Sequence, residues 1–398
     1  MWRASLVSLC ALLPGAALGS PPLPHGAYVG QRARGEAVED AVARAPGELT
    51  SLVWLAAELD PRARPPVRLM SLGLARRSGR PVGLAVRVHE LPRAAFDASA
   101  PPRELLDAVD AVLERARAER VSPTELQLDL DCPTRALGAY AAWARAIAAR
   151  AGELPVTVTA LPAWLGAPGF DRLARASAGF VLQVHSLSLP SARGARATLF
   201  DAAAAKAAVA RAAALGVPFR VALPTHGYAL RYDDSGRLAD VLAEEGDAAD
   251  ARELAADPAA VAGFVRWLER RRPREAVGAV WFRLPTRDDS RSVTQDGLRS
   301  LMAGEAPHAR LRARARRDAD GALAIELTNE GEVPARAARV EVALAALLDF
   351  DAASSRATSA RDRVVFETGG LAPHATRSLG WVRSRDARAV AEVTIDAP

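Results

Sequence analysis

Cysteine is nearly absent from this 398-residue chain, which contains only Cys10 and Cys132. Cys10 lies in an N-terminal apolar run that has the pattern of a cleaved leader, so we expect the mature protein to keep one cysteine. A single cysteine cannot form an intramolecular disulfide, and this excludes the class of small disulfide-stabilised secreted domains. Because half of the residues are apolar, the chain can build a large hydrophobic core instead.

Lysine is also rare, since Lys206 is the sole lysine among 52 basic residues. The formal net charge of +5 therefore comes from arginines, and 47 acidic residues are interspersed with them. The chain has no basic arm and no motif that combines basic with aromatic residues. This distribution is typical of a solvated surface, and we predict no nucleic-acid partner.

Long hydrophobic runs are missing as well, and the clearest apolar run lies at the N-terminus. Arg3 precedes an apolar run over residues 4–13, and residues 17–19 supply the small side chains that a signal peptidase recognises. The run is shorter than the ~20 residues of a membrane-spanning helix. We therefore expect residues 1–19 to be a cleaved signal peptide. The mature protein would be exported to the periplasm or the extracellular space, without stable membrane insertion.

Apolar strand-like runs alternate with amphipathic helical patterns over residues 20–305. The helical stripes recur at 3.6-residue spacing, as in Leu105, Val109 and Val112. Eight such alternations predict an α/β fold, a (β/α)8 TIM-like barrel. No glycine-rich phosphate loop follows the first strand, which argues against a dinucleotide-binding fold. The expected strands are 26–31, 52–59, 82–91, 126–131, 156–161, 180–185, 219–224 and 277–284.

Period-2 patterns replace the helical ones in the last part of the chain. The apolar runs there are separated by turn sequences such as Asp320-Gly321 and Gly369-Gly370. Short strands at this spacing predict a small β-sandwich domain over residues 309–398. Fold analogy alone does not make such a domain a sugar binder, so we predict a structural role for it.

One predicted strand has an unusually polar side. The run from Glu125 to Cys132 reads Glu-Leu-Gln-Leu-Asp-Leu-Asp-Cys, so three leucines occupy one face and Gln127, Asp129 and Asp131 the other. Unpaired carboxylates are costly to bury, and parallel-sheet enzymes keep their chemistry at the carboxyl ends of strands. We predict a polar cleft there, with Asp131 nearest its mouth. The alternative is that these aspartates only form structural ion pairs with arginines.

The other strands and two loops bring further side chains to the same rim. Trp164 follows the fifth strand, and His226 and Tyr228 follow the seventh, where aromatic rings could stack on sugar rings. The segment 226–257 is long for a barrel loop and predicts a hairpin that acts as a lid. Strand parity predicts these additional rim residues: Gln31, Trp54, Glu58, Arg87, His89 or else Glu90, Thr157, Thr159, Gln183, His185, Trp281 and Arg283.

Four segments carry a resemblance to a known family. They are Leu-Gln-Leu-Asp-Leu-Asp-Cys-Pro-Thr over 126–134, Val-Thr-Ala-Leu-Pro-Ala-Trp over 158–164, Val-Leu-Gln-Val-His over 181–185 and Ala-Leu-Pro-Thr-His-Gly-Tyr over 222–228. These motifs resemble an uncharacterised bacterial family, the domain of unknown function 3142, over most of the mature chain. The resemblance implies an exported barrel related in shape to glycoside hydrolases, with no established activity.

Glycoside hydrolysis is the first of three functional hypotheses. It usually needs two carboxyl groups, and Asp129 and Asp131 lie two strand residues apart, roughly 6.6 Å. We predict Asp131 as the acid or base, Asp129 as the group that tunes its pKa, and Glu58 or Glu90 as a further carboxylate. The spacing resembles the Asp-rich strand of chitinase-type barrels. Those barrels carry a Glu two residues after the last Asp, where this chain has Pro133.

The second hypothesis is a non-catalytic glycan-binding barrel, and the third is a metal-dependent hydrolase. His89, His185 and His226 have ligand chemistry together with Asp131, but no His-x-His or His-Glu-x-x-His pair positions two ligands. We therefore predict no metal and no cofactor, and a carbohydrate ligand. The predicted ligand-contacting residues are Gln127, His89, Trp164, Gln183, His185, His226, Tyr228, Trp281 and Arg283.

Overall fold

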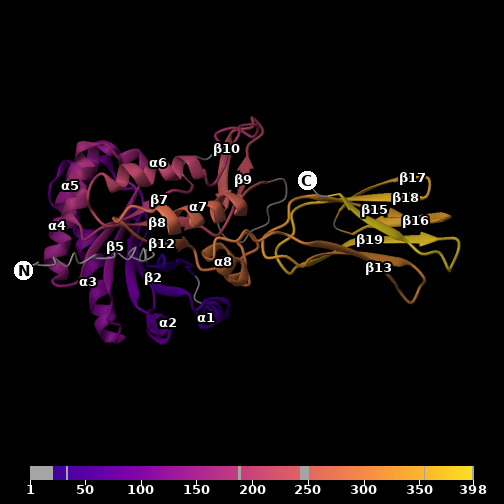
Figure 1. Ribbon diagram of the computed structural model, residues 1–398, viewed down its shortest axis with the longest axis horizontal. Coiled ribbons are helices and arrows are strands. Elements are labelled where there is room, and N and C mark those ends of the chain that lie inside the picture. The colour runs from indigo at the N-terminus through magenta and orange to yellow at the C-terminus, as the bar shows by residue number, and fades with distance from the viewer. Residues whose placement is uncertain (1–20, 33–34, 187–189, 243–250, 354, 397–398) are drawn as a thin grey trace, which may run out of the picture.

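The computed structural model describes residues 21–32, 35–186, 190–242, 251–353 and 355–396, so the predicted signal peptide lies outside the described residues. Eight parallel strands close into a barrel, because the last of them, β12, pairs with both β8 and β1 (Figure 1). The predicted (β/α)8 barrel is confirmed. In barrel order the strands are β1 (His25–Val29), β2 (Leu49–Leu59), β4 (Val82–Val88), β5 (Glu125–Leu130), β6 (Val156–Ala160), β7 (Phe180–Gln183), β8 (Phe219–Pro224) and β12 (Ala276–Phe282).

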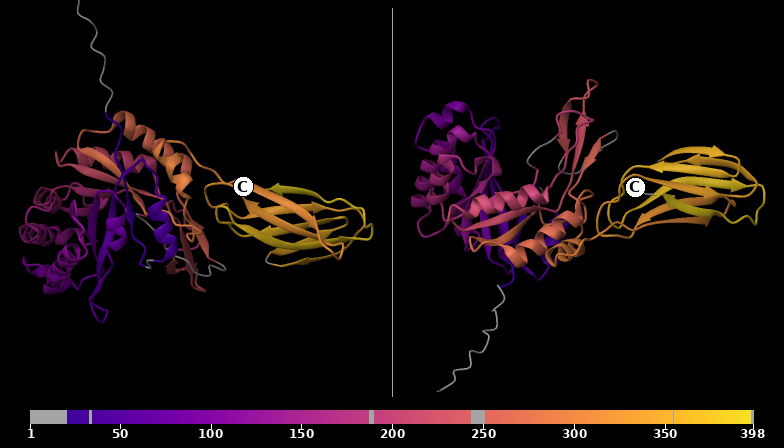
Figure 2. Two further views of the ribbon diagram at one scale, coloured as in Figure 1. Left: turned by 90° about the horizontal axis from the view of Figure 1, so that it is seen from below. Right: turned by 45° about the horizontal axis from the view of Figure 1, so that its top comes forward.

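Helices surround the barrel and bury the stripes that the sequence predicts (Figures 1 and 2). Leu105, Val109 and Val112 of α3 are all buried in the layer between helices and strands. Each buried side chain of this size stabilises the fold by roughly 1.5–3 kcal/mol relative to an exposed one. The helices are α1 (Glu36–Ala43), α2 (Gly73–Arg77), α3 (Arg103–Ala118), α4 (Leu137–Ala151), α5 (Pro168–Ala176), α6 (Ala202–Ala213), α7 (Pro258–Arg271) and α8 (Gln295–Met302).

A bulge in β2 changes which side chains face the inside of the barrel. The pairing of β2 with β4 shifts between Leu55 and Ala57, which reverses the strand parity from there on. Val53 therefore lies inside the barrel, whereas Trp54 packs outward and donates a hydrogen bond from Nε1 to the Ser71 carbonyl at 3.1 Å. The prediction that Trp54 lines the rim is wrong for this reason. Glu58, beyond the bulge, does reach the mouth.

A small antiparallel sheet follows the end of β8. It consists of β9 (Tyr228–Tyr232), β10 (Leu238–Leu242) and β11 (Arg252–Leu254), with β9 in the centre. Leu230 and Leu254 pack with Leu199 into a core of their own, and the sheet projects from the barrel as an arm (Figure 2, right). The sequence predicted a hairpin here, and its role as a lid stays a prediction. A further short strand, β3 (Val67–Leu69), pairs antiparallel with the end of β2.

The C-terminal part is a β-sandwich of two four-stranded antiparallel sheets, as predicted. Its core contains Ile325, Val340, Phe366 and Leu379. A loop of the sandwich contacts the barrel, because the backbone N–H of Thr294, which precedes α8, donates to the Glu332 carbonyl at 3.0 Å. One sheet has the order β13 (Leu311–Arg317), β14 (Leu323–Asn329), β19 (Thr376–Ser384), β16 (Leu347–Ala352). The other has the order β17 (Arg356–Ala360), β18 (Arg363–Thr368), β15 (Ala338–Ala343), β20 (Glu392–Asp396).

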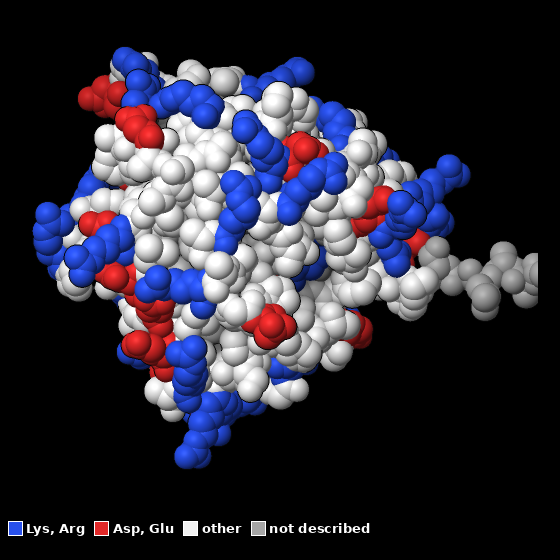
Figure 3. Space-filling view, turned by 90° about the vertical axis from the view of Figure 1, so that its left-hand side faces the viewer, with Lys and Arg blue, Asp and Glu red and all other residues white. Residues whose placement is uncertain are grey.

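The surface carries its charges in a scattered pattern. On the face in Figure 3, basic side chains lie between acidic ones and broad uncharged areas rather than along one continuous groove. The prediction of no nucleic-acid partner is consistent with this face and stays a prediction. Among the residues that the structure describes, no helix combines the length and the apolar character needed to cross a membrane.

Candidate active site

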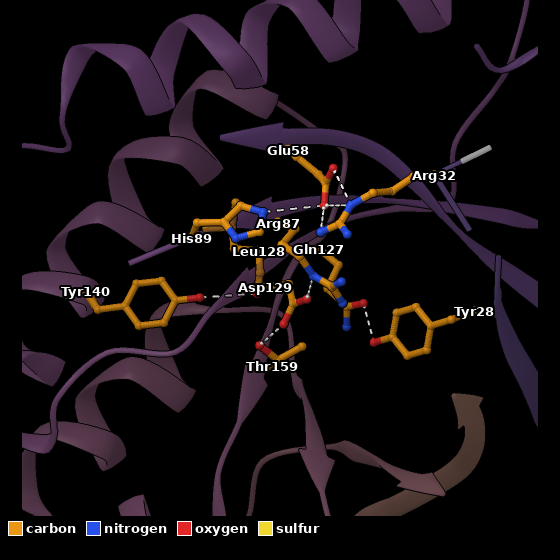
Figure 4. A network of polar contacts seen from close by, with 10 residues as sticks. All are labelled: Tyr28, Arg32, Glu58, Arg87, His89, Gln127, Leu128, Asp129, Tyr140 and Thr159. Atoms are coloured by element: carbon orange, nitrogen blue, oxygen red, sulfur yellow. Dashed lines mark hydrogen bonds and ion pairs between the residues drawn. The ribbon is translucent and has the colours of Figure 1, made fainter. Parts of the chain in front are cut away.

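The polar side of β5 points into the barrel, as its sequence pattern predicts (Figure 4). Gln127 is fully buried, and its Oε1 accepts a hydrogen bond from the Tyr28 hydroxyl at 2.5 Å. Its Nε2 has no hydrogen-bond partner among the described residues. Leu126, Leu128 and Leu130 face the helices instead. The strand therefore presents Gln127 inside the barrel and Asp129 closer to the mouth.

Asp129 is held by side chains from the strands on both sides. Arg87 of β4 donates from Nε to its Oδ2 at 2.9 Å, and Thr159 of β6 donates to its Oδ1 at 3.0 Å. The negative charge of Asp129 raises the pKa of Arg87 above its usual value. Both oxygens of Asp129 are thus engaged by donors. Asp129 therefore forms the structural ion pair with an arginine that the sequence offered as the alternative. It is not a free nucleophile.

We expect Asp129→Asn to destabilise the barrel by about 1–3 kcal/mol. The substitution leaves the largely buried guanidinium of Arg87 without its counter-charge, and the cost lies below that of a fully buried pair because both side chains keep some exposure. The matched control is Asp110→Asn, which breaks the exposed surface pair between Asp110 and Arg150. Urea unfolding should show little or no loss of stability for the control, because solvent screens an exposed pair. Equal losses in both variants would contradict the role given to Asp129.

Asp131 differs from Asp129 because it has no partner. It lies directly after the end of β5, is exposed, and forms no hydrogen bond or ion pair with any residue that the structure describes. Desolvation by the neighbouring protein atoms raises the pKa of Asp131, the charge of Asp129 raises it further, and Arg87 opposes both. A carboxyl group with these properties keeps its proton to a higher pH than an ordinary aspartate. A raised pKa is one of the properties that a general acid needs.

Glu58 is a buried carboxylate at the same end of the barrel. Desolvation opposes its ionisation, but the hydrogen bonds and charge of Arg32, together with His89 and Arg87, lower its pKa overall. Arg32 donates from Nε to both Glu58 oxygens at 2.9 and 3.0 Å, and Nε2 of His89 lies 3.4 Å from Oε1. Glu58 is therefore an ionised carboxylate with occupied oxygens. The other candidate, Glu90, is exposed and pairs with Arg62.

Two histidines form a cluster with aromatic rings near the base of the arm. The ring of His226 lies 6.4 Å from that of His185 and 5.0 Å from that of Tyr228. Burial lowers the pKa of His185 to about 3, with His226 contributing, and burial lowers the pKa of His226 to about 4. Both imidazoles are therefore neutral at pH 7. Tyr228 is half-buried and therefore more exposed than the two histidines, and its hydroxyl donates a hydrogen bond to Oγ of Ser186 at 3.1 Å.

Three predicted rim residues have buried side chains, so the prediction that they contact a ligand is wrong. Trp164 is only 2% exposed and packs between Tyr140 and Phe170. Burial of so large an apolar ring stabilises the fold more than its exposure to solvent would. Trp281 is fully buried on the outer side of β12. Arg283 is buried and pairs with Asp289 at 2.9 Å.

The parity of β12 was predicted one residue out of phase, and this hid an inward-facing aromatic residue. Val280 and Phe282 face the barrel interior, where the Phe282 ring lies 5.5 Å from the ring of Tyr28 and 5.7 Å from the ring of His185. The guanidinium of Arg87 lies 5.7 Å from the centre of the same ring. Phe282, Tyr28 and Arg32 are the site residues that sequence reasoning missed. The alternation of Val280 with Phe282 was the available signal for Phe282.

The remaining predicted residues make local contacts. Gln183 is half-buried at the end of β7 and donates to the His185 carbonyl at 3.2 Å. Gln31 donates to the Leu284 carbonyl at 2.8 Å. Thr157 lies deeper in the barrel and donates to Glu125 at 2.9 Å. In the described part of the chain, no three His, Cys, Asp or Glu side chains come together as a metal site would need.

Solved structures with a similar fold include a spore cortex-lytic enzyme and chitinases. The spore cortex-lytic enzyme SleL of Bacillus cereus matches with a TM-score of 0.50 and 11% identity over 71% of this chain and 74% of its own. The chitinase ChiB of Flavobacterium johnsoniae gives 0.49 and 9%, over 72% and 94%. A chitinase of Chromobacterium violaceum gives 0.48 and 13%, over 71% and 97%. At such low identity the likeness to SleL shows the fold alone.

Sequence comparison gives the family. No curated protein matches the chain. One family model matches residues 78–287, which is 210 of the 398 residues and includes β4 to β12 with the aspartates of β5. The chain therefore belongs to the family described as a domain of unknown function (DUF3142).

Proposed function

We propose that this protein is an exported glycoside hydrolase that cleaves glycosidic bonds in a poly- or oligosaccharide, with Asp131 as the proton donor. The observation that carries the proposal is the contrast between two carboxyl groups on one strand end. Asp129 is fixed by Arg87 and Thr159, whereas Asp131 is exposed, unpartnered among the described residues and has a raised pKa. The glycoside-hydrolase-like fold supports the reaction class, and the N-terminal leader pattern supports export.

The neighbours of Asp131 would supply orientation and electrostatics. The ion pair with Arg87 fixes the negative charge of Asp129 close to Asp131, so Asp131 stays protonated to higher pH. Phe282 offers a half-buried ring between the strand ends, and Gln183 offers an amide oxygen. Such apolar and polar groups together can hold a sugar ring and its hydroxyls. Asp131 would then protonate the oxygen of the leaving sugar.

A non-catalytic glycan-binding barrel is the second candidate. The observation that favours it is that Asp129 and Glu58 are both bound to arginines, so neither is a free second carboxylate. A metal-dependent hydrolase receives no support from the described residues, because they bring no three ligand side chains together.

The test is a screen of the mature protein against bacterial and plant glycans, spore cortex included, with reducing-end release and thermal shift recorded together. Asp131→Asn is the test variant, and Asp107→Asn, on the exposed side of α3, is the matched control. Release that is lost only in Asp131→Asn supports the hydrolase. A thermal shift without release supports glycan binding. If no glycan gives either release or a thermal shift, the carbohydrate assignment is wrong.

A further inference from the structure

A second group with proton-transfer chemistry lies at the same end of the barrel as Asp131. His89 follows the end of β4, and 36% of its side-chain surface is exposed. Its Nε2 faces Glu58, and its Nδ1 has no hydrogen-bond partner among the described residues. Figure 4 shows this ring to one side of Glu58, with the pair formed by Arg87 and Asp129 nearby. An imidazole at a solvent-accessible mouth with one unoccupied ring nitrogen can accept a proton.

A contact with Glu58 orients the ring of His89. Arg32 holds Glu58 through two hydrogen bonds of 2.9 and 3.0 Å, and Glu58 is only 6% exposed. A buried, ionised carboxylate 3.4 Å from Nε2 favours the tautomer with the proton on Nε2. The basic lone pair is then on Nδ1. A carboxylate that orients a solvent-accessible imidazole is an arrangement that activates water or hydroxyl groups in hydrolases.

The strand register places His89 level with Asp131. Arg87 of β4 pairs with Asp129 of β5 in the barrel, and His89 and Asp131 each come two positions later, directly after the ends of these strands. The same parity directs both toward the mouth. The contact with Glu58 draws the imidazole toward β2, on the side of β4 away from β5. Asp131 follows β5 and the ring is directed toward β2, so the two groups diverge. Inverting glycosidases need such a divergence, because a water molecule stands between an acid and a base roughly 6.5–9.5 Å apart.

We propose that His89 is the catalytic base of the reaction and that Glu58 is its positioning residue. This inference rests on the proposed function, since it assigns the partner of Asp131. Asp131 gives its proton to the glycosidic oxygen as the bond from that oxygen to the anomeric carbon breaks. A water molecule forms the new bond to the anomeric carbon and gives its proton to Nδ1 of His89. One water is consumed, two hydroxyl groups result, and the proton on His89 returns to Asp131 through solvent.

This arrangement determines the stereochemistry of the product. A double displacement through an enzyme carboxylate needs a free carboxylate that attacks the sugar, and the oxygens of Asp129 and Glu58 are occupied by Arg87, Thr159 and Arg32. Attack by water in a single displacement inverts the anomeric configuration. The product released first should therefore have the configuration opposite to that of the substrate.

The experiment uses the mature wild-type protein and the best glycan from the screen. Proton NMR during the first turnovers gives the anomeric configuration of the product. We expect inversion, and a fall in kcat of about 10²-fold for His89→Ala with a nearly unchanged KM. Added imidazole should restore part of the activity of His89→Ala. The matched control is His308→Ala, since His308 is exposed and lies outside the barrel mouth.

Glu58→Gln tests the positioning role. We expect kcat to fall about 10–100-fold at unchanged KM, without rescue by imidazole, because the base is present but misoriented. A retained configuration, or full activity of His89→Ala beside an inactive Asp131→Asn, overturns this inference and leaves the proposed function standing. A wild-type protein that releases no sugar from any glycan overturns both.

Discussion

Replacing Asp131 by asparagine is expected to lower turnover by a factor on the order of 10²–10⁴ while the protein folds normally and still binds its glycan. An asparagine has nearly the shape of an aspartic acid but carries no transferable proton, so the leaving sugar departs without protonation. Asp131 forms no hydrogen bond or ion pair with the described residues, so its replacement breaks no structural contact there. The measurement is kcat and KM for Asp131→Asn and for the control Asp107→Asn, with the glycan that the wild type cleaves.

The same variant should be more stable than the wild type at neutral pH. Because the pKa of Asp131 is higher in the folded protein than in the unfolded chain, the wild type loses stability as pH rises from the unfolded pKa through the folded one. The asparagine side chain cannot ionise, so the variant should unfold at a higher temperature near pH 7. The gain should shrink as pH falls and vanish well below the unfolded pKa of about 3.9, where the wild-type carboxyl is protonated in both states. A variant that is less stable at pH 7 would show that Asp131 has a structural role.

Local sequence patterns predicted the barrel and the polar face of β5 for the same physical reason. A parallel strand covered by helices needs an unbroken apolar side, and Leu126, Leu128 and Leu130 supply it, so the opposite side had to hold Gln127 and Asp129. Strand parity predicted the wrong inward-facing residues where a strand is irregular or where both of its faces are apolar. The bulge in β2 reversed the side on which Trp54 lies, and either phase of β12 offered an aromatic ring to the interior.

The sequence raised the possibility of ion pairs with arginines but could not identify the partners. The sequence distinguishes Asp129 from Asp131 only by their order along the strand, and it does not show that Arg87, 42 residues from Asp129 along the chain, binds Asp129. Glu58 was predicted as a catalytic carboxylate, but Arg32, 26 residues away, occupies its oxygens. Such partners are brought together by strand register and not by spacing. The roles of the three carboxyl groups therefore depend on contacts that only the folded barrel creates.

Mild acid is expected to destabilise the barrel by about 3–6 kcal/mol between pH 7 and pH 5. Burial lowers the pKa of His185 to about 3, and burial lowers those of His226 and His25 to about 4. In the unfolded chain all three titrate near their usual pKa of about 6.5. Between pH 7 and pH 5 the unfolded chain therefore binds protons at these histidines and the folded protein does not. The stability is fully present above the unfolded pKa of about 6.5 and is lost as pH falls below it, by up to about 1.4 kcal/mol per pH unit for each histidine.

Urea unfolding at pH 7, 6 and 5 measures this loss, in a window where most carboxyl groups are still ionised in both states. His185→Gln is the informative variant, because a glutamine side chain cannot take up the proton, so the loss between pH 7 and pH 5 should shrink by about a third. His308→Gln is the matched control, since His308 is exposed and its replacement should leave the pH dependence as it is. A wild-type stability that stays constant from pH 7 to pH 5 would mean that these imidazoles accept protons in the folded state. Water would then reach the cluster of His185, His226 and Tyr228, and the two imidazoles would not be shielded from solvent.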